Sequence, residues 1–333
     1  MRGPSRSSGP PEPHLLDRGQ PGHGSRRPAG LLDPPAVRPR GQAEPARAPR
    51  PERSQIGPPA WPAPRDHLIP GGLGAAPARA GASLCAMETL ENKLALVTGA
   101  SSGIGAATAR ALRAEGCHLV LAARRLDALE ALAEELGECQ VLQLDVRDAD
   151  AVLEQLGPLP IDICVANAGL GIGMETIQEG DPAEWALMID TNVKGLLHTV
   201  RAVTPGMIER GRGDVVLIGS VAGRQVYPKG NVYCASKWAV RAIYESLRED
   251  LPHPELRVST VDPGMVRTDF SRVRFRGDEA AAAKVYENVD YLTPEDVADA
   301  VRYIVTRPPH VNIGELVLWA SAQGSTTNLT RKS

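Results

Sequence analysis

The chain has 333 residues and a net charge of −3, and only 4% of its residues are aromatic. Residues 1–86 hold 18 of the 29 prolines together with 12 arginines, 6 acidic residues and no lysine. This composition cannot bury enough apolar surface to fold, which predicts disorder for 1–86. Residues 87–333 suffice for one domain with a large core. Their acidic balance argues against nucleic-acid binding, and no apolar run reaches the length of a membrane span or signal peptide.

Met87 opens a segment that resembles a natural start. We therefore interpret 1–86 as an upstream extension or a dispensable tail. The alternatives are an organelle transit peptide and a nucleic-acid-binding arm, although frequent prolines and acidic residues are atypical of transit peptides.

The five cysteines are scattered and lack Cys-x-x-Cys spacing. They predict reduced thiols in a cytoplasmic compartment, rather than disulfides or zinc ligands. The seven histidines show no metal-ligand spacing, so no metal is expected.

Short apolar runs alternate with segments of helical periodicity from Lys93 onward. Strands are predicted at 94–98, 118–122, 141–145, 161–166, 214–219, 257–261 and 315–319. Helices are predicted from the first glycine turn through Ala114 and at 126–136, 149–156, 185–210, 230–251 and 294–306. The helix 185–210 is expected to bend near Pro205, and Thr293 to cap the last helix. The alternation predicts an α/β domain, a doubly wound parallel seven-stranded sheet with helices on both faces.

A glycine-rich turn follows the first predicted strand. Glycines in such a turn let the backbone approach a pyrophosphate at a helix N-terminus. The residues expected to bind a dinucleotide there are Gly99, Ser101, Ser102, Gly103, Ile104 and Gly105.

The end of the second strand indicates which nucleotide is bound. An acidic residue there would bind the ribose 2′-hydroxyl of NAD, but this chain has Arg124 and Arg125. Two guanidinium groups suit a 2′-phosphate, which favours NADP. The alternative is that both arginines merely begin a solvated helix.

Two further strand ends are expected to line the cofactor cleft. Asp145 and Val146 follow the third strand, where Asp145 either contacts the adenine or caps a helix. Asn167, Ala168 and Gly169 end the fourth strand, beside the adenosine ribose or as a simple turn.

Tyr233 and Lys237 are four residues apart, so on a helix they share one face. An ammonium near a phenol lowers its pKa toward the range of an acid/base catalyst. Ser220 lies thirteen residues before the tyrosine.

Together these motifs resemble the short-chain dehydrogenases/reductases of the Tyr-x-x-x-Lys type, which have a Rossmann-like fold. The resemblance covers about residues 91–320 and includes Asn192 and Pro263-Gly264. One departure is Ala166, where the family often has asparagine.

The resemblance implies a role for each matching residue. Tyr233 would exchange the hydroxyl proton, and Lys237 would lower its pKa and bind the nicotinamide ribose. Ser220 would bind the substrate oxygen, and Asn192 would hold a water that links Lys237 to solvent. The segment with Pro263, Gly264, Val266 and Thr268 would surround the nicotinamide. The resemblance also implies a homotetramer assembled through the helices of Asn192 and Tyr233.

Segments outside these motifs resemble the NADP-dependent 3-hydroxy acid dehydrogenases, which include serine 3-dehydrogenases. The resemblance implies small substrates such as L-serine, L-allo-threonine or 3-hydroxypropionate-like acids. Arg272, Arg274 and Arg276 follow the Pro-Gly motif, and we expect one of them to bind the substrate carboxylate, unless they form a solvated charge run. Two alternatives stay open: a reductase of larger carbonyls (3-oxoacyl, steroid or xenobiotic compounds), and an NADP-binding sensor or scaffold without turnover.

Overall fold

The computed structural model describes residues 87–251 and 256–332. The segment 1–86, for which the sequence predicts disorder, lies outside these residues. Within the described ranges, no helix combines the length and apolarity needed to cross a bilayer.

In the described part of the chain, seven parallel strands form one sheet in the order β3-β2-β1-β4-β5-β6-β7. The predicted seven-stranded doubly wound sheet is thereby confirmed. The strands are β1 (Leu94–Thr98), β2 (His118–Ala123), β3 (Cys139–Gln143), β4 (Ile163–Ala166), β5 (Gly213–Ile218), β6 (Leu256–Pro263) and β7 (Glu315–Leu318).

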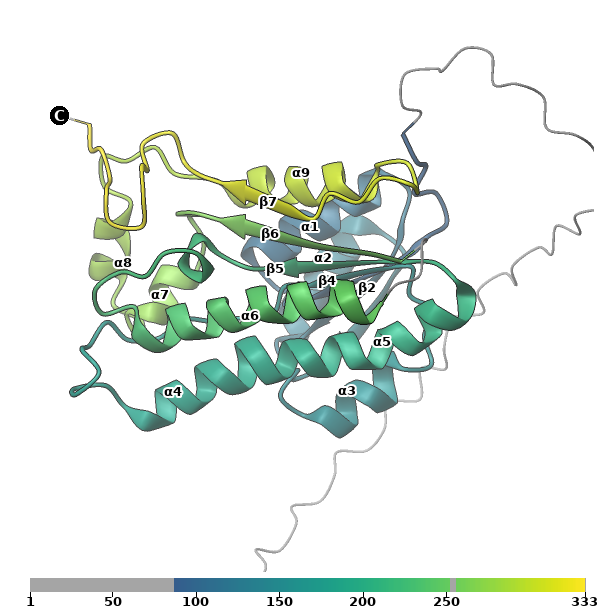
Figure 1. The fold of residues 1–333 in the computed structure, drawn as a ribbon, viewed down its shortest axis with the longest axis horizontal. Coiled ribbons are helices and arrows are strands. Elements are labelled where there is room, and N and C mark those ends of the chain that lie inside the picture. The colour runs from purple at the N-terminus through teal and green to yellow at the C-terminus, as the bar shows by residue number, and fades with distance from the viewer. Residues whose placement is uncertain (1–86, 252–255, 333) are drawn as a thin grey trace, which may run out of the picture. The chain divides into compact units, whose positions relative to one another are not determined.

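Helices cover both faces of the sheet, as Figure 1 shows. They are α1 (Gly103–Ala114), α2 (Leu126–Leu136), α3 (Ala149–Leu156), α4 (Pro182–Ile189), α5 (Leu196–Arg210), α6 (Asn231–Asp250), α7 (Phe270–Arg274), α8 (Glu279–Val285) and α9 (Pro294–Val305). Two short turns complete the set: the π-helical η1 (Asp190–Gly195) and the 3-10 helical η2 (Val221–Gly223).

The apolar core has two layers, one on each side of the sheet. Side chains of α1, α2 and α9 pack on one face, and those of α3, α5 and α6 on the other. β1, β4, β5 and β6 are buried along their whole length. Strands buried on both faces tend to have continuous apolar sequences, as β1 and β4 do, which is why the apolar runs located them. β6 also buries polar residues, among them Arg257 and Asp262.

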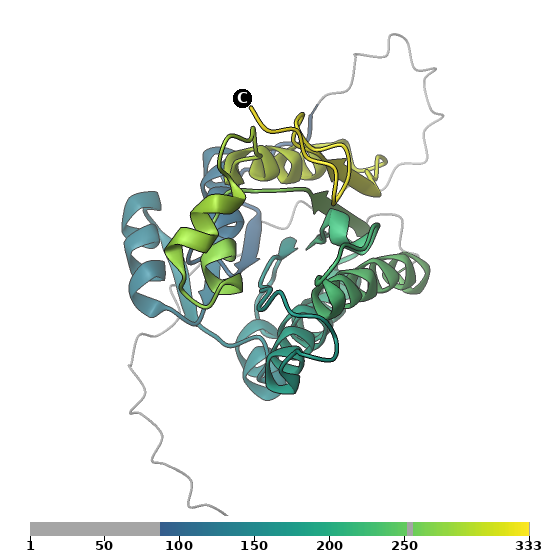
Figure 2. The ribbon, with the colours of Figure 1, turned by 90° about the vertical axis from the view of Figure 1, so that its left-hand side faces the viewer.

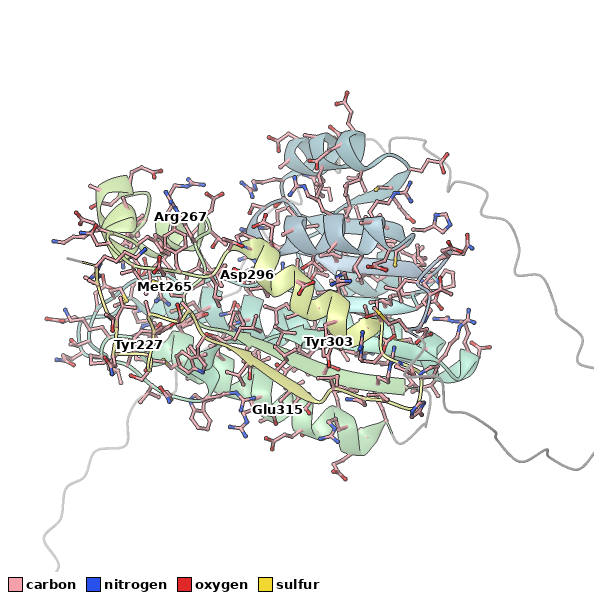
Figure 3. The ribbon with its side chains drawn as sticks, turned by 90° about the horizontal axis from the view of Figure 1, so that it is seen from above. Tyr227, Met265, Arg267, Asp296, Tyr303 and Glu315 are labelled. Atoms are coloured by element: carbon pink, nitrogen blue, oxygen red, sulfur yellow. The ribbon has the colours of Figure 1, made fainter. Side chains whose placement is uncertain are left out.

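The N-terminus of α9 confirms the predicted cap. Thr293 Oγ1 accepts a hydrogen bond from Asp296 N, and Asp296 Oδ2 accepts one from Thr293 N at 2.7 Å. Asp296 lies at this end of the helix in Figure 3.

The predicted helix 185–210 is two helices joined by a π-helical turn. α4 begins earlier, at Pro182 behind the Asp181 cap, and α5 starts after η1. The irregular hydrogen bonding falls at η1, and Pro205 lies inside α5. Periodicity does not reveal this turn, because its sequence, Asp-Thr-Asn-Val-Lys-Gly, has no apolar pattern that distinguishes a π-helical turn from an α-helix.

Two other differences affect the site. β3 begins and ends two residues earlier than predicted, so Asp145 and Val146 lie beyond the strand. The helices α7 and α8 were not predicted, since they have only five and seven residues.

Candidate active site

A cleft of about 700 Å³ lies at the carboxyl ends of the strands. Segments that follow β1, β2, β3, β4, β5 and β6 line it, together with α7. Figure 2 views the molecule from this end of the sheet, with the strands between the two helix layers. Crevices outside the carboxyl ends of parallel strands are the usual ligand sites of doubly wound sheets.

The glycine turn forms one wall of the cleft. Gly99 has φ +66°, a left-handed conformation that favours glycine. A methyl group on Gly105 would overlap the carbonyl oxygen of Gly99 and come within 2.6 Å of Asn167 Nδ2. The same Asn167 nitrogen donates to Thr98 O at 2.9 Å and so connects β1 with the end of β4. The three segments therefore form one tightly packed cradle with room for a ligand backbone.

Arg124 and Arg125 lie beside this turn, at the end of β2. Both side chains are exposed and line the cleft. Arg125 Nη2 donates to Ser102 Oγ at 2.8 Å and to Ser101 Oγ at 3.2 Å. Two guanidinium groups and two hydroxyl groups therefore lie close together here. An anionic ligand at this place would accept hydrogen bonds from several of them.

Most residues expected to bind the cofactor line this cleft. Asp145 does so with its carboxylate bound by Arg147, an ion pair that holds the pKa of Asp145 below its usual range. Gly105 packs behind the turn and does not line the cleft. The other lining residues among those expected are Gly99, Ser101, Ser102, Gly103, Ile104, Val146, Asn167, Ala168, Gly169, Pro263, Gly264, Val266 and Thr268.

Ser220, Tyr233 and Lys237 line the opposite wall. Ser220 follows β5, and its hydroxyl oxygen accepts from Ala222 N at 3.1 Å. Tyr233 and Lys237 are on α6, where their spacing does place them on one face. Lys237 Nζ donates to Ile218 O at 2.9 Å.

The electrostatics of Tyr233 differ from the expectation. Burial raises the pKa of Tyr233, while the charge of Arg274 and a hydrogen bond with Ser220 act in the opposite direction. The Arg274 guanidinium carbon is 4.6 Å from the centre of the Tyr233 ring. In this structure Arg274 is therefore the cation that favours the phenolate. Burial lowers the pKa of Lys237 to about 8, against the opposing effect of Asp262.

Asn192 lies in η1, behind the cleft wall. Its Oδ1 accepts from Leu170 N at 2.8 Å, and its Nδ2 donates to Leu170 O and to Ser236 Oγ. These bonds fix the segment after β4 against α6, and they give the π-helical turn a local stabilising contact.

The three candidate arginines have different surroundings. Arg276 does not line the cleft and pairs with Glu175 and Glu184 at 2.8 and 2.6 Å. Arg272 is an exposed cleft residue near two carboxylates, at 3.7 Å from each.

Arg274 lies over three aromatic rings. Its guanidinium carbon is 4.8 Å from the centre of Phe270 and 5.7 Å from that of Tyr227, besides the contact with Tyr233. Among the described residues, no partner hydrogen-bonds its buried Nε. A cation next to Tyr233 with a free donor is suited to a substrate anion.

The sequence motifs did not predict several residues that line the cleft. Tyr227 and Met265 lie at the same end of the sheet in Figure 3 and both line the cleft. Gln323 reaches the site from the C-terminal segment, where its Oε1 accepts from Met265 N at 2.9 Å. One feature of the sequence could have indicated an aromatic wall: both phenylalanines of the chain, Phe270 and Phe275, lie in the arginine-rich segment.

Residues 93–279 match the short chain dehydrogenase family, and this chain belongs to that family. The NADP-dependent 3-hydroxy acid dehydrogenase of Salmonella typhi is 45% identical over 237 residues, which are 69% of this chain and 96% of the relative. The enzyme of the same name from Schizosaccharomyces pombe is 38% identical over 257 residues, 74% of this chain and 99% of the relative.

Solved structures give the same family. The closed form of a serine dehydrogenase complexed with NADP⁺ aligns with a TM-score of 0.69 and 42% identity, covering 72% of this chain and all of that one. The Escherichia coli serine dehydrogenase aligns with a TM-score of 0.59 and 40% identity, covering 68% of this chain and 96% of that one.

Proposed function

We propose that this enzyme transfers a hydride between NADP(H) and a small 3-hydroxy acid, with Tyr233 as acid/base. The observation that carries the proposal is the shared cleft: Tyr233, Lys237 and Ser220 face the glycine turn and the Arg124–Arg125 pair across about 700 Å³. The relatives named as NADP-dependent 3-hydroxy acid dehydrogenases and serine dehydrogenases support it.

The residues fit a nicotinamide dinucleotide phosphate. The glycine turn offers backbone N–H groups to a pyrophosphate, and Arg124 and Arg125 suit the 2′-phosphate. The segment from Pro263 to Thr268 and Lys237 would hold the nicotinamide half. When bound, the cofactor supplies the hydride chemistry, and the protein supplies orientation and proton transfer.

In the oxidation direction, Tyr233 would take the proton of the substrate hydroxyl. Ser220 would donate a hydrogen bond to the substrate oxygen and hold it toward the phenol. Lys237 would bind the ribose and connect to solvent through a water near Asn192. Arg274 would bind the carboxylate and at the same time favour the phenolate of Tyr233.

The first test is NADPH formation by the full chain with L-serine and L-allo-threonine. Turnover should be faster with NADP than with NAD. Tyr233→Phe should lose ~10²–10⁴-fold in kcat, which is the usual contribution of a positioned acid/base. Turnover that survives in Tyr233→Phe would contradict the proposed role. If neither acid is oxidised while NADPH still binds, the result favours the reductase of larger carbonyls, and a wider substrate panel separates it from a sensor without turnover.

The substrate carboxylate can be tested separately with Arg274→Met. The loss of a charge-assisted hydrogen bond should raise KM for L-serine ~10–100-fold, with a smaller effect on a neutral alcohol of similar size. Arg272→Met and Arg276→Met are matched controls, because carboxylates already lie near both guanidinium groups. An unchanged KM in Arg274→Met would exclude this arginine as the carboxylate ligand.

We also propose a cytoplasmic homotetramer assembled through α5 and α6. Exposed apolar side chains on these helices support such an interface: Leu197, Ile208 and Trp238 are 43, 47 and 43% exposed. The cysteines within the described residues are free thiols, as expected for a reducing compartment. Light scattering of the purified chain and microscopy of a tagged chain would test the two statements.

A further inference from the structure

A buried carboxylate lies behind the proposed catalytic wall. Asp262 is on β6 and is only 3% exposed. Its Oδ1 accepts from Thr260 Oγ1 at 2.8 Å, and its Oδ2 accepts from Arg224 Nε at 2.7 Å. Arg224 also pairs with Glu315 at the start of β7, which Figure 3 labels. Asp262 is thus a fixed negative charge with defined partners.

The carboxylate touches the strand end that carries Ser220. Gly219 N donates to Val261 O at 2.9 Å, and a side chain on Gly219 would overlap Asp262 Oδ1. Lys237 Nζ donates to the carbonyl oxygen of the preceding residue, Ile218. Asp262 and Lys237 therefore lie against two consecutive residues of one backbone segment.

Asp262 carries a negative charge against the same backbone segment that Lys237 Nζ contacts, Ile218–Gly219. From α6 itself the titratable neighbour is Tyr233, and from β5 the contact is the Ile218 carbonyl. η1 contributes the neutral amide of Asn192, which lies with Lys237 Nζ on one side of Gly169. Lys237 is only 8% exposed, so water screens the charge of its side chain weakly. In such surroundings a nearby carboxylate favours the ammonium form.

We propose that Asp262 is a positioning residue: its carboxylate, oriented by Arg224 and Thr260, is the counter-charge that keeps Lys237 protonated and supports the Ser220 segment from behind. The inference rests on the proposed function, since Lys237 matters to turnover only if it assists Tyr233. Arg224 has a distinct part in this arrangement, because its positive charge partly neutralises the same carboxylate.

The charge of Lys237 can be measured without turnover. Trace acetylation of the full chain by acetic anhydride at a series of pH values, quantified by mass spectrometry, follows the neutral amine of Lys237. Asp262→Asn should lower the midpoint by ~0.5–1 pH unit, because the amine loses its counter-charge. Arg224→Gln should shift the midpoint in the opposite direction, since Asp262 then loses a competing cation. Glu135→Gln is the control and should leave the midpoint unchanged, because this carboxylate pairs with Arg110 between α1 and α2.

The same variants should shift the basic limb of the kcat profile for L-serine oxidation in the same directions. A midpoint in Asp262→Asn equal to that of the wild type would overturn the proposal, whatever happens to kcat. If Asp262→Asn does not fold, an unshifted midpoint in Arg224→Gln would overturn it equally. Failure of the proposed function gives a different result, namely no oxidation of the hydroxy acids by the wild type, with Lys237 still titrating as described.

Discussion

Lys237 is a lysine whose charge the fold keeps largely away from water. Burial lowers its pKa to about 8, from an ordinary value near 10.4. The protonated form is therefore less favourable in the folded than in the unfolded chain. Below about pH 8 the full cost is present, on the order of 3 kcal/mol, and it disappears as pH rises toward 10.4.

We expect Lys237→Met to reveal this cost in the unliganded protein. Relative to the wild type, the variant should be more stable at pH 7 than at pH 10.5, because only the wild type loses a proton in that window. Thermal melting at the two pH values measures the difference. A stability difference that does not vary with pH would show that Lys237 titrates normally.

Arg125 gives a second prediction for a single side chain. Arg125→Ala should raise KM for NADP about 10- to 100-fold and leave KM for NAD nearly unchanged, because only NADP has a 2′-phosphate. Steady-state kinetics with both nucleotides provide the test. Arg110→Ala is a suitable control, since that exposed arginine pairs with Glu135 on α2. An equal loss with both nucleotides would instead indicate a defect in the glycine turn.

Single residues were predictable where a motif fixes their spacing. Tyr233, Lys237 and Ser220 have such spacing, and the structure brings them to one wall of the cleft. Sequence could not choose among Arg272, Arg274 and Arg276, because the turn of α7 decides which of them faces the aromatic rings. Arg224 and Asp262 were missed for a similar reason: they are 38 residues apart, and only the β5–β6 pairing brings them together.

Among the elements, η1 connects the packing of two helices to the cofactor cleft. Gly195 ends this turn, and a methyl group there would lie 2.5 Å from Val146 Cγ2. Val146 lines the cleft, so a larger residue at position 195 would displace Val146 and change the wall that binds the cofactor. Close packing of this kind is felt even for one added carbon.

Gly195→Ala should therefore destabilise the protein by about 1–3 kcal/mol and weaken NADPH binding. Gly206→Ala on α5 is the matched control. There a methyl group meets the end of the long Arg210 side chain at 2.9 Å, and alanine favours the helix. Chemical denaturation and NADPH fluorescence would distinguish the two variants. Similar behaviour of both would mean that the contact with Val146 has no special role.

Element types were predictable wherever burial gives a continuous apolar run, as in β1, β4 and β5. The elements missed are those whose existence depends on partners far along the chain. α7 and α8 have five and seven residues, and hydrogen bonds such as that from Tyr286 Oη to Val266 O hold them over the cleft. Local propensity carries little information about such contacts.

At the scale of the whole molecule, the end of the sheet opposite the cleft has an ionic cluster. Arg257 pairs with Asp214 at 2.5 Å and with Glu88 at 3.3 Å, and it is 5% exposed. The backbone N–H of Glu88 also donates to Thr306 O at 2.9 Å. The residues just after Met87 are thus part of the folded structure.

Glu88→Ala should lower stability by ~1–2 kcal/mol without changing KM for NADP, because the cluster is distant from the cofactor residues. Removal of residues 1–86 should leave both quantities unchanged. Melting temperature and KM of the full chain, the truncated chain and the variant would test this. Lower activity in the chain that starts at Met87 would show that the preceding segment contributes to function.

The strand order has a consequence for how the enzyme becomes active during synthesis. The glycine turn and the arginine pair follow β1 and β2, which the ribosome synthesises first. Ser220, Tyr233 and Lys237 follow β5 and are synthesised later. The second edge of β1 pairs with β4, so it stays unpaired until β4 has been synthesised. A nascent chain could therefore assemble the nucleotide wall early, while the proton-transferring wall appears only late in translation. If NADP binds this early wall, it would stabilise the first strands and favour the productive order of folding.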